Sequence, residues 1–154
     1  MQLVASTRVE ASPSEVFRFF EGMEENYARW HPGHIRFLWL DGGSLEAGSK
    51  AHFEERIGGK YQEKTVRFTE VDPDRYIEFK PTSLRVAALM PHVSFTIDPR
   101  PDGCSVTQRI TVRTGPVGAW LNRREFDAVR QHMEEEGANL KRILEEEPKV
   151  TTSA

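Results

Sequence analysis

The sequence predicts an α+β fold in which a curved, seven-stranded antiparallel sheet packs against a long C-terminal helix. Three observations support this prediction. One segment near the N-terminus and six segments between residues 35 and 113 alternate apolar and polar residues, as strands with one buried face do. Gly, Pro or Asp turns separate these segments and favour antiparallel neighbours. Beyond residue 116 the apolar period becomes helical.

The first predicted elements are a strand over residues 3–12 and a short helix directly after it. Ser12 suits an N-cap, Pro13 suits the first helical position, and Glu15 stands where a capping-box glutamate is expected. The apolar face of this helix consists of Val16, Phe19 and Phe20.

Tyr27–His34 reads YARWHPGH, which indicates a turn around its Pro-Gly pair before the sheet resumes. Six further strands then follow one another along the chain. Their alternating segments are residues 35–40, 49–57, 60–71, 75–80, 92–100 and 103–113.

The C-terminal helix is predicted from five apolar residues that share one helical face. At about 100° per residue, with Phe126 at zero, these residues centre near roughly 330°. They are Phe126, Val129, Met133, Leu140 and Leu144. We expect residues 1–147 to form one domain, and the polar residues 148–154 to form a flexible tail.

Composition limits the classes of partner. The 154 residues carry a formal charge of -3, so no overall basic excess points to nucleic acid or anionic lipid. The single Cys104 excludes an intramolecular disulfide and a multi-cysteine metal site. No basic leader or membrane-spanning apolar run is present. We therefore expect a soluble, cytoplasmic protein with a small-molecule partner; nothing in the sequence indicates its oligomeric state.

Two polar residues lie beside the apolar stripe of the C-terminal helix. His132 falls near roughly 240° and Glu136 near roughly 280°, both on the flank that leans toward the sheet, whereas Glu135 points away. Because they are four residues apart, their side chains can reach one ion. A surface histidine is the alternative interpretation of His132.

A third candidate lies on the strand over residues 49–57. Alternation puts Glu55 on the same face as Phe53 and Ile57, and Glu54 on the opposite face. A carboxylate on an inward face has to be paired, protonated or bound to a cation. A Glu–Arg pair, or a register shift at the following Gly-Gly that leaves Glu55 outside, is the alternative.

The turn before the second strand supplies a fourth candidate, His34. Together with Glu55, His132 and Glu136 it offers two imidazoles and two carboxylates from three separate elements, which suits Zn2+. His31 in place of His34, and Glu54 in place of Glu55, remain alternative assignments.

The order of strand, short helix, antiparallel strands and long terminal helix resembles the helix-grip superfamily, also called Bet v 1-like, START-like or SRPBCC. The resemblance covers nearly the whole chain. It implies a curved sheet wrapped around the terminal helix, with an apolar cavity between them that binds hydrophobic ligands. The apolar segment 81–91 is then either a cover over the cavity entrance or an ordinary packed connection.

A closer resemblance concerns three motifs: Y-x-x-W-H-P before a histidine, E-x-I-G-G on a strand, and H-x-x-x-E on the terminal helix. This set resembles the zinc-dependent diacetylphloroglucinol and phloretin hydrolases, which cleave a carbon–carbon bond between a phenolic ring and an acyl group. The resemblance implies one zinc ion per chain. It assigns His34, Glu55, His132 and Glu136 as zinc ligands, Tyr27 as the catalytic residue that holds a phenolic oxygen, and Trp30 as a pocket wall.

Strand and helix phase predict the remaining lining of the cavity, which suits a flat aromatic molecule. The predicted wall consists of Phe37, Trp39, Phe53, Leu89, Met90, Phe95 and Met133. The sequence therefore favours a zinc-dependent hydrolase of an acylated phenol or diketone. The alternatives are a carrier or sensor of a hydrophobic ligand and a metal-free polyketide cyclase or dehydratase.

Overall fold

The computed structural model describes residues 1–30 and 33–146, apart from the side chain of His34. Its sheet contains seven strands, and every neighbouring pair is antiparallel. The order across the sheet is β1-β7-β6-β5-β4-β3-β2. The strands are β1 (Gln2–Val9), β2 (His34–Trp39), β3 (Lys50–Ile57), β4 (Lys60–Asp72), β5 (Tyr76–Pro81), β6 (His92–Arg100) and β7 (Gly103–Thr111).

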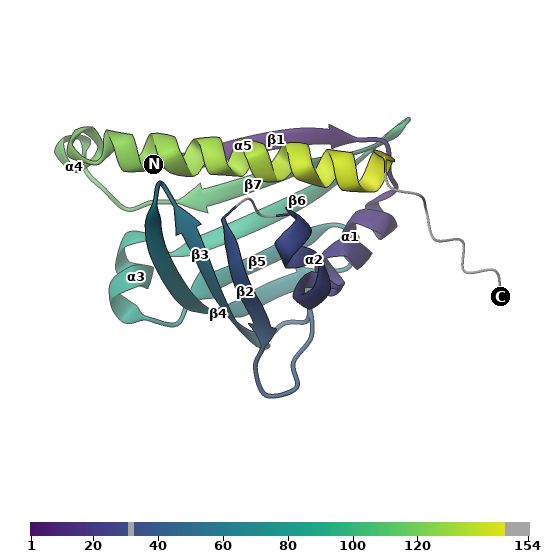
Figure 1. Cartoon of the computed structure of the whole chain (residues 1–154), viewed down its shortest axis with the longest axis horizontal. Helices are drawn as coiled ribbons and strands as arrows, with labels where there is room; N and C mark the ends of the chain where they lie inside the picture. The colour runs from purple at the N-terminus through teal and green to yellow at the C-terminus, as the bar shows by residue number, and fades with distance from the viewer. Residues whose placement is uncertain (31–32, 147–154) are drawn as a thin grey trace.

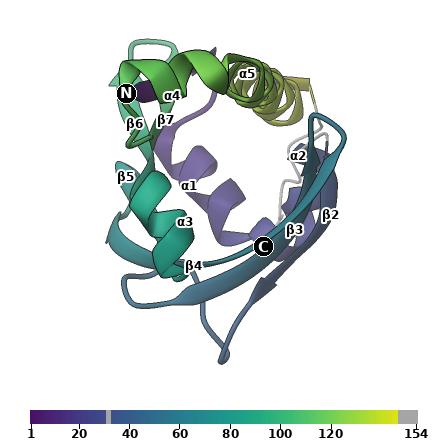
Figure 2. The ribbon, with the colours of Figure 1, turned by 90° about the vertical axis from the view of Figure 1, so that its left-hand side faces the viewer.

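Five helices complete the described part of the chain. They are α1 (Pro13–Glu21), α2 (Met23–Trp30), α3 (Leu84–Leu89), α4 (Pro116–Leu121) and α5 (Arg123–Glu146). The strongly curved sheet and the long helix α5 enclose the interior, with α5 along β1 and the short helices α1 and α2 between β1 and β2 in the chain (Figures 1 and 2). The predicted seven-stranded helix-grip fold is therefore confirmed.

The N-terminus of α1 forms as its sequence predicts. The hydroxyl of Ser12 accepts a hydrogen bond of 3.1 Å from the backbone N–H of Glu15, and Pro13 occupies the first turn. Val16, Phe19 and Phe20 are buried on one side of the helix. This cap and apolar face fix where the chain turns from β1 into the space enclosed by the sheet.

Three short helical segments depart from the sequence prediction. Residues 23–30, which precede the predicted Pro-Gly turn and for which no separate helix was specified, form α2. Residues 84–89 form α3 where only a connection was expected. Pro116 begins a separate helix, α4, so that the long helix starts after Asn122. The predicted tail, residues 148–154, lies outside the described residues, as does His31.

The buried face of α5 is also rotated from its predicted direction. Ile143 is buried, whereas Leu144 is only partly covered. With the same convention of about 100° per residue, the buried residues centre near roughly 290°, close to Glu136 rather than near roughly 330°. They are His132, Met133, Glu136, Leu140 and Ile143. The helix therefore turns its polar pair fully inward.

Candidate functional site

A cavity lies between the concave face of the sheet and α5, with a volume of about 150 Å³. Its wall is mostly apolar, and seven of the eight residues predicted to form it contribute to it. These residues are Trp30, Phe37, Trp39, Phe53, Met90, Phe95 and Met133. The sequence therefore predicted most of the apolar cavity wall correctly.

Leu89 is the exception in the predicted wall. Met90 lines the cavity, but Leu89 is on α3 and half of its surface is exposed. The prediction treated residues 89 and 90 as part of an apolar connection facing inward. Because residues 84–89 coil into a helix, successive side chains point in different directions and Leu89 turns outward.

Helix α2 brings two aromatic residues to the cavity. Tyr27 and Trp30 are both buried, with ring centroids 6.3 Å apart. The Tyr27 ring also contacts Phe37 at 5.3 Å and Phe53 at 6.1 Å between centroids. Aromatic neighbours on two strands therefore hold the Tyr27 ring, which directs its hydroxyl toward the polar end of the cavity.

The carboxylate of Glu55 lies at this polar end. Its side chain is buried, and its Oε2 accepts a hydrogen bond of 3.1 Å from the Tyr27 hydroxyl. Its Oε1 lies 3.6 Å from Nζ of Lys64 on β4. Glu54 lies on the opposite face, where its Oε1 accepts a hydrogen bond from Tyr61. The predicted register, with Glu55 inward and Glu54 outward, is correct.

His132 and Glu136 reach the cavity from α5. Nε2 of His132 lies 3.3 Å from Oε1 of Glu136, and only 8% and 5% of these two residues is exposed. Both line the cavity with Glu55 and Tyr27. Three of the four predicted ligands, from two separate elements, therefore share one wall. We call Tyr27, Glu55, His132 and Glu136 the polar cluster.

Burial and charge act strongly on this cluster. Loss of hydration raises the pKa of Glu136 well above its ordinary value, and the nearby carboxylate of Glu55 raises it further. A hydrogen bond with Gln108 and the charge of Lys64 act in the opposite direction. Burial, and next the charge of Glu55, also raise the pKa of Tyr27, so its phenol stays a hydrogen-bond donor at neutral pH.

The backbone of His34 lies opposite Glu55 in the pairing of β2 with β3. Gly33 precedes it and accepts a 2.8 Å hydrogen bond from the backbone N–H of Arg56. A Cβ at Gly33 would overlap the carbonyl oxygen of Arg56, so this close approach requires glycine. The side chain of His34 lies outside the described part of the chain.

Sequence reasoning missed three polar residues on the cavity wall. They are Gln62, Lys64 and Gln108. Lys64 shares the strand phase of Val66 and Phe68, both buried, so the alternation of β4 contains the signal that it points inward. The partner of Lys64, Glu55, lies on another strand, and single-strand periodicity does not reveal such pairs.

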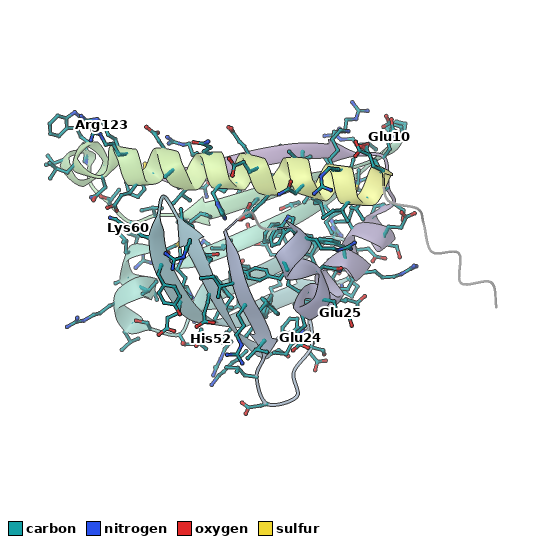
Figure 3. The ribbon with its side chains drawn as sticks, in the orientation of Figure 1. Glu10, Glu24, Glu25, His52, Lys60 and Arg123 are labelled. Carbon is teal, nitrogen blue, oxygen red and sulfur yellow. The ribbon has the colours of Figure 1, made fainter. Side chains whose placement is uncertain are left out.

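A second group of possible metal ligands lies away from the cavity. Among the described side chains, His52, Glu54 and Glu63 bring ligand atoms within 4.8 Å of one another on β3 and β4. Figure 3 labels His52 on these strands. Glu63 is exposed, and Tyr61 donates hydrogen bonds to both carboxylates. Exposed clusters of this kind are common without a metal, so the cavity remains the candidate site.

The apolar wall and the polar cluster together can bind a flat molecule and either transfer protons to it or hold a cation beside it. An apolar, aromatic wall binds the body of a flat molecule, while the polar cluster meets whichever oxygens the molecule carries at one end. Carboxylates, a phenol and an imidazole can transfer protons, and the carboxylates with the imidazole can also hold a divalent cation.

Comparison with known proteins assigns the chain to a family. A family model described as "Polyketide cyclase / dehydrase and lipid transport" matches residues 1–145, nearly the whole chain. No curated protein matches in sequence. None of the helices in the described part of the chain is long and apolar enough to cross a membrane.

Several solved structures share the fold at low sequence identity. The KanY protein (ms6282) has 16% identity and a TM-score of 0.73, with 94% of this chain and 97% of that chain covered. The protein TTHA0849 from Thermus thermophilus has 14% identity, the same TM-score and the same coverage. The di-domain ARO/CYC BexL from the BE-7585A biosynthetic pathway has 21% identity and a TM-score of 0.69 over 92% of this chain and 45% of that chain.

Proposed function

We propose that this chain, which belongs to the polyketide cyclase/dehydrase and lipid transport family, is an enzyme that binds a flat molecule of the polyketide type and acts on it at the polar cluster. The observation that carries the proposal is the pair of buried carboxylates, Glu55 and Glu136, on the wall of an otherwise apolar cavity. Each is only 5% exposed.

A carrier of hydrophobic ligands has no need of this pair. Burying a carboxylate costs several kcal/mol unless partners offset the lost hydration, and two nearby carboxylates also repel each other. Lys64 lies close enough to offset part of the cost at Glu55. The burial of a second carboxyl group, Glu136, near Glu55 favours a role with a ligand, a proton or a cation over a role in stability.

The cavity selects for molecules with an apolar body and oxygen at one end. Phe37 and Phe53 stack nearly parallel, with an interplanar angle of 10°, and Trp39 contacts Phe37 edge-on. Such walls suit a flat ring system. The Tyr27 hydroxyl, which donates to Glu55, can donate instead to a phenolic or carbonyl oxygen. Phenolic polyketides combine these two features.

Cyclisation or dehydration without a metal is the first candidate reaction. In this reaction a carboxylate removes a proton from a carbon beside a carbonyl, and a hydrogen-bond donor holds the oxygen on which negative charge develops. Glu55 would serve as the base, and Tyr27 or His132 as the donor. The family description and the likeness of the fold to that of the aromatase/cyclase BexL support this candidate.

Zinc-dependent hydrolysis of an acylated phenol is the second candidate. A specific observation favours it: Glu55, His132 and Glu136, which the sequence resemblance implies as ligands, all line one cavity. Imidazole nitrogen and carboxylate oxygen are donors that zinc accepts, so the set fits the ion. His34, opposite Glu55 in the sheet, would complete it.

A bound zinc ion would supply a Lewis acid and lower the pKa of a coordinated water. The residues of the chain perform the remaining tasks. Tyr27 holds the phenolic oxygen, and the aromatic wall aligns the ring so that the acyl group lies at the polar cluster. In the hydrolysis, the acyl carbon gains a hydroxyl group from water, the bond to the ring breaks, and the ring carbon takes up a proton. The products are a carboxylic acid and a phenol.

One experiment separates these candidates. Purified, undialysed protein is analysed for metal and then incubated, with and without added zinc, with acylated phenols, β-diketones and a poly-β-keto compound; products are followed by chromatography. Stoichiometric zinc with release of carboxylic acid supports hydrolysis. Turnover to a cyclised or dehydrated product in metal-free protein supports the first candidate. Tight binding without any turnover contradicts the enzyme proposal and supports a carrier.

Variants of the polar cluster, compared with an exposed control on α5, test whether the reaction takes place at this cluster. His132→Ala and Glu136→Ala remove two members of the polar cluster and should abolish turnover, together with zinc uptake if zinc is bound. Glu135→Ala changes an exposed neighbour on the same helix and should preserve both. Equal losses in all three variants would contradict the assignment of the polar cluster as the reaction centre.

A further inference from the structure

The helices α3 and α4 expose apolar side chains that the core does not use. The described part of the chain exposes nine large hydrophobic side chains, and five of these lie on the two helices. Neither helix has a buried residue. The five residues, with their exposed fractions, are Leu84 (88%), Leu89 (53%), Val117 (72%), Trp120 (62%) and Leu121 (66%).

The two helices occupy the same end of the molecule. The backbone N–H of Arg113, just before α4, donates a 2.7 Å hydrogen bond to the carbonyl oxygen of Leu89 at the end of α3. Figure 2 looks at this end, with α3 and α4 close to the viewer. We call residues 82–90 and 113–124 the α3–α4 rim.

The rim adjoins one end of the cavity. Pro81 and Met90, which flank α3, both line the cavity. Val129, near the start of α5, and Ile57, at the end of β3, line it as well. An apolar molecule that leaves the cavity between these residues therefore meets the exposed apolar side chains of the rim.

The charge of the rim differs from that of the whole chain. Residues 82–90 and 113–124 contain four arginines and no Asp or Glu, a local charge of +4, whereas the chain as a whole carries -3. All four arginines, Arg85, Arg113, Arg123 and Arg124, are exposed. Glu125, the next acidic residue, is already paired with Lys60 at 2.8 Å. Figure 3 labels Arg123 and Lys60 at this end.

We propose that the α3–α4 rim docks on an anionic lipid bilayer. Exposed Trp, Leu and Val side chains enter the boundary between headgroups and acyl chains, and arginines around them attract anionic headgroups. The guanidinium of Arg123 lies 4.7 Å from the Trp120 ring centroid, so a cationic side chain and an aromatic side chain are adjacent on the rim. The remaining surface, negative overall, is repelled and sets the orientation.

Docking in this orientation places the end of the cavity beneath α3 against the lipid. An apolar ligand can then pass between bilayer and cavity without crossing water. The net charge of the chain predicts no attraction to anionic lipid, because it averages over the basic rim and the acidic remainder. The proposal rests on the rim alone and holds for a carrier as well as for an enzyme.

Vesicle co-sedimentation tests the proposal. The full chain is mixed with vesicles of phosphatidylcholine alone, and with vesicles that also contain phosphatidylglycerol. We expect binding to the anionic vesicles only, weakened by added salt. Trp120→Ser with Leu121→Ser, and separately Arg123→Gln with Arg124→Gln, should each weaken binding about tenfold or more.

Two controls match these variants. Arg18→Gln with Arg142→Gln removes the same charge from positions on α1 and near the end of α5, and Val4→Ser removes an exposed apolar side chain from β1. Both should bind as the parent chain does. Equal losses in variants and controls, or equal binding to uncharged vesicles, would overturn the proposal. An absence of binding to the anionic vesicles would also overturn it. Self-association that the Trp120 variant removes would then show that the rim joins two copies of the chain.

Discussion

The hydroxyl of Tyr27 donates a hydrogen bond of 3.1 Å to Oε2 of Glu55 across the polar end of the cavity. The two residues lie 28 positions apart in the chain and come from α2 and β3. The bond therefore depends on the docking of α2 against the sheet. It ties the residue expected to orient a ligand to a carboxylate of the polar cluster, so its loss should affect both stability and binding.

Tyr27→Phe should lower the free energy of unfolding by about 1–3 kcal/mol, because a buried carboxylate loses a hydrogen-bond donor. The measurement is urea unfolding in the presence of a chelator. Tyr61→Phe is the matched control, since Tyr61 donates a 2.6 Å bond to Glu54 on the exposed face. Its effect should be within about 0.5 kcal/mol. Equal effects would mean that the Tyr27–Glu55 contact is not buried in solution.

Glu136→Gln should raise the stability of the metal-free protein. The amide keeps the shape of the side chain but cannot ionise, so it avoids the free-energy cost of burying or protonating a carboxyl group beside Glu55. We expect a gain of about 1–2 kcal/mol, or roughly 2–8 °C in Tm for a chain of this length. Thermal unfolding measures the gain, and Glu135→Gln, which changes an exposed residue, should leave Tm nearly unchanged. A loss of stability in Glu136→Gln would show that its charge is fully compensated.

Features of the fold and the site that depend on neighbouring residues could be predicted from the sequence, whereas features that depend on distant residues could not. Alternation and the Ser12 cap depend on neighbouring residues, and they placed the strands, α1 and Glu55 correctly. The direction of α5 was predicted less well, because apolar residues alone defined its buried face. Glu136 lies at the centre of that face, and a count of hydrophobic residues treats a buried carboxylate as exposed.

Other features escaped prediction because they depend on distant parts of the chain. Helix α3 has only six residues, too few for a periodic pattern, and its apolar side chains suggested burial. The contact of Lys64 with Glu55 joins two strands, and neither strand alone specifies it. The zinc ligands and the reaction stay predictions, since the fold is compatible with several functions. The membrane partner is a proposal from the structure, and the net charge of the sequence argued against it.

Cys104 should be almost unreactive while the chain is folded. Burial, and to a smaller extent the charge of Glu15, raise the pKa of its thiol to about 11 from an ordinary value of 9.0. Two pKa units reduce the thiolate fraction about 100-fold near pH 8, and the side chain is fully buried. Labelling with a thiol reagent should therefore be at least about 100-fold slower than in urea. Fast labelling of the native protein would contradict the burial of this end of β7.

Gly137 lies where α5 packs closely against Thr7 on β1. In a free helix, replacing this glycine with alanine would stabilise by about 1 kcal/mol. Here a Cβ at Gly137 would overlap Oγ1 of Thr7 on β1. Gly137→Ala should therefore lower the free energy of unfolding by about 1–3 kcal/mol, as overpacking does.

A double-mutant cycle isolates the cause of this loss. Thr7→Ala removes the hydroxyl and methyl groups that the new Cβ would meet, so Gly137→Ala made in that background should be neutral or stabilising. Urea unfolding of the four proteins gives the coupling energy, which should be about 1 kcal/mol or more. If Gly137→Ala stabilises the chain in both backgrounds, α5 lies farther from β1 than the structure shows, and the buried positions of His132 and Glu136 would have to be revised with it.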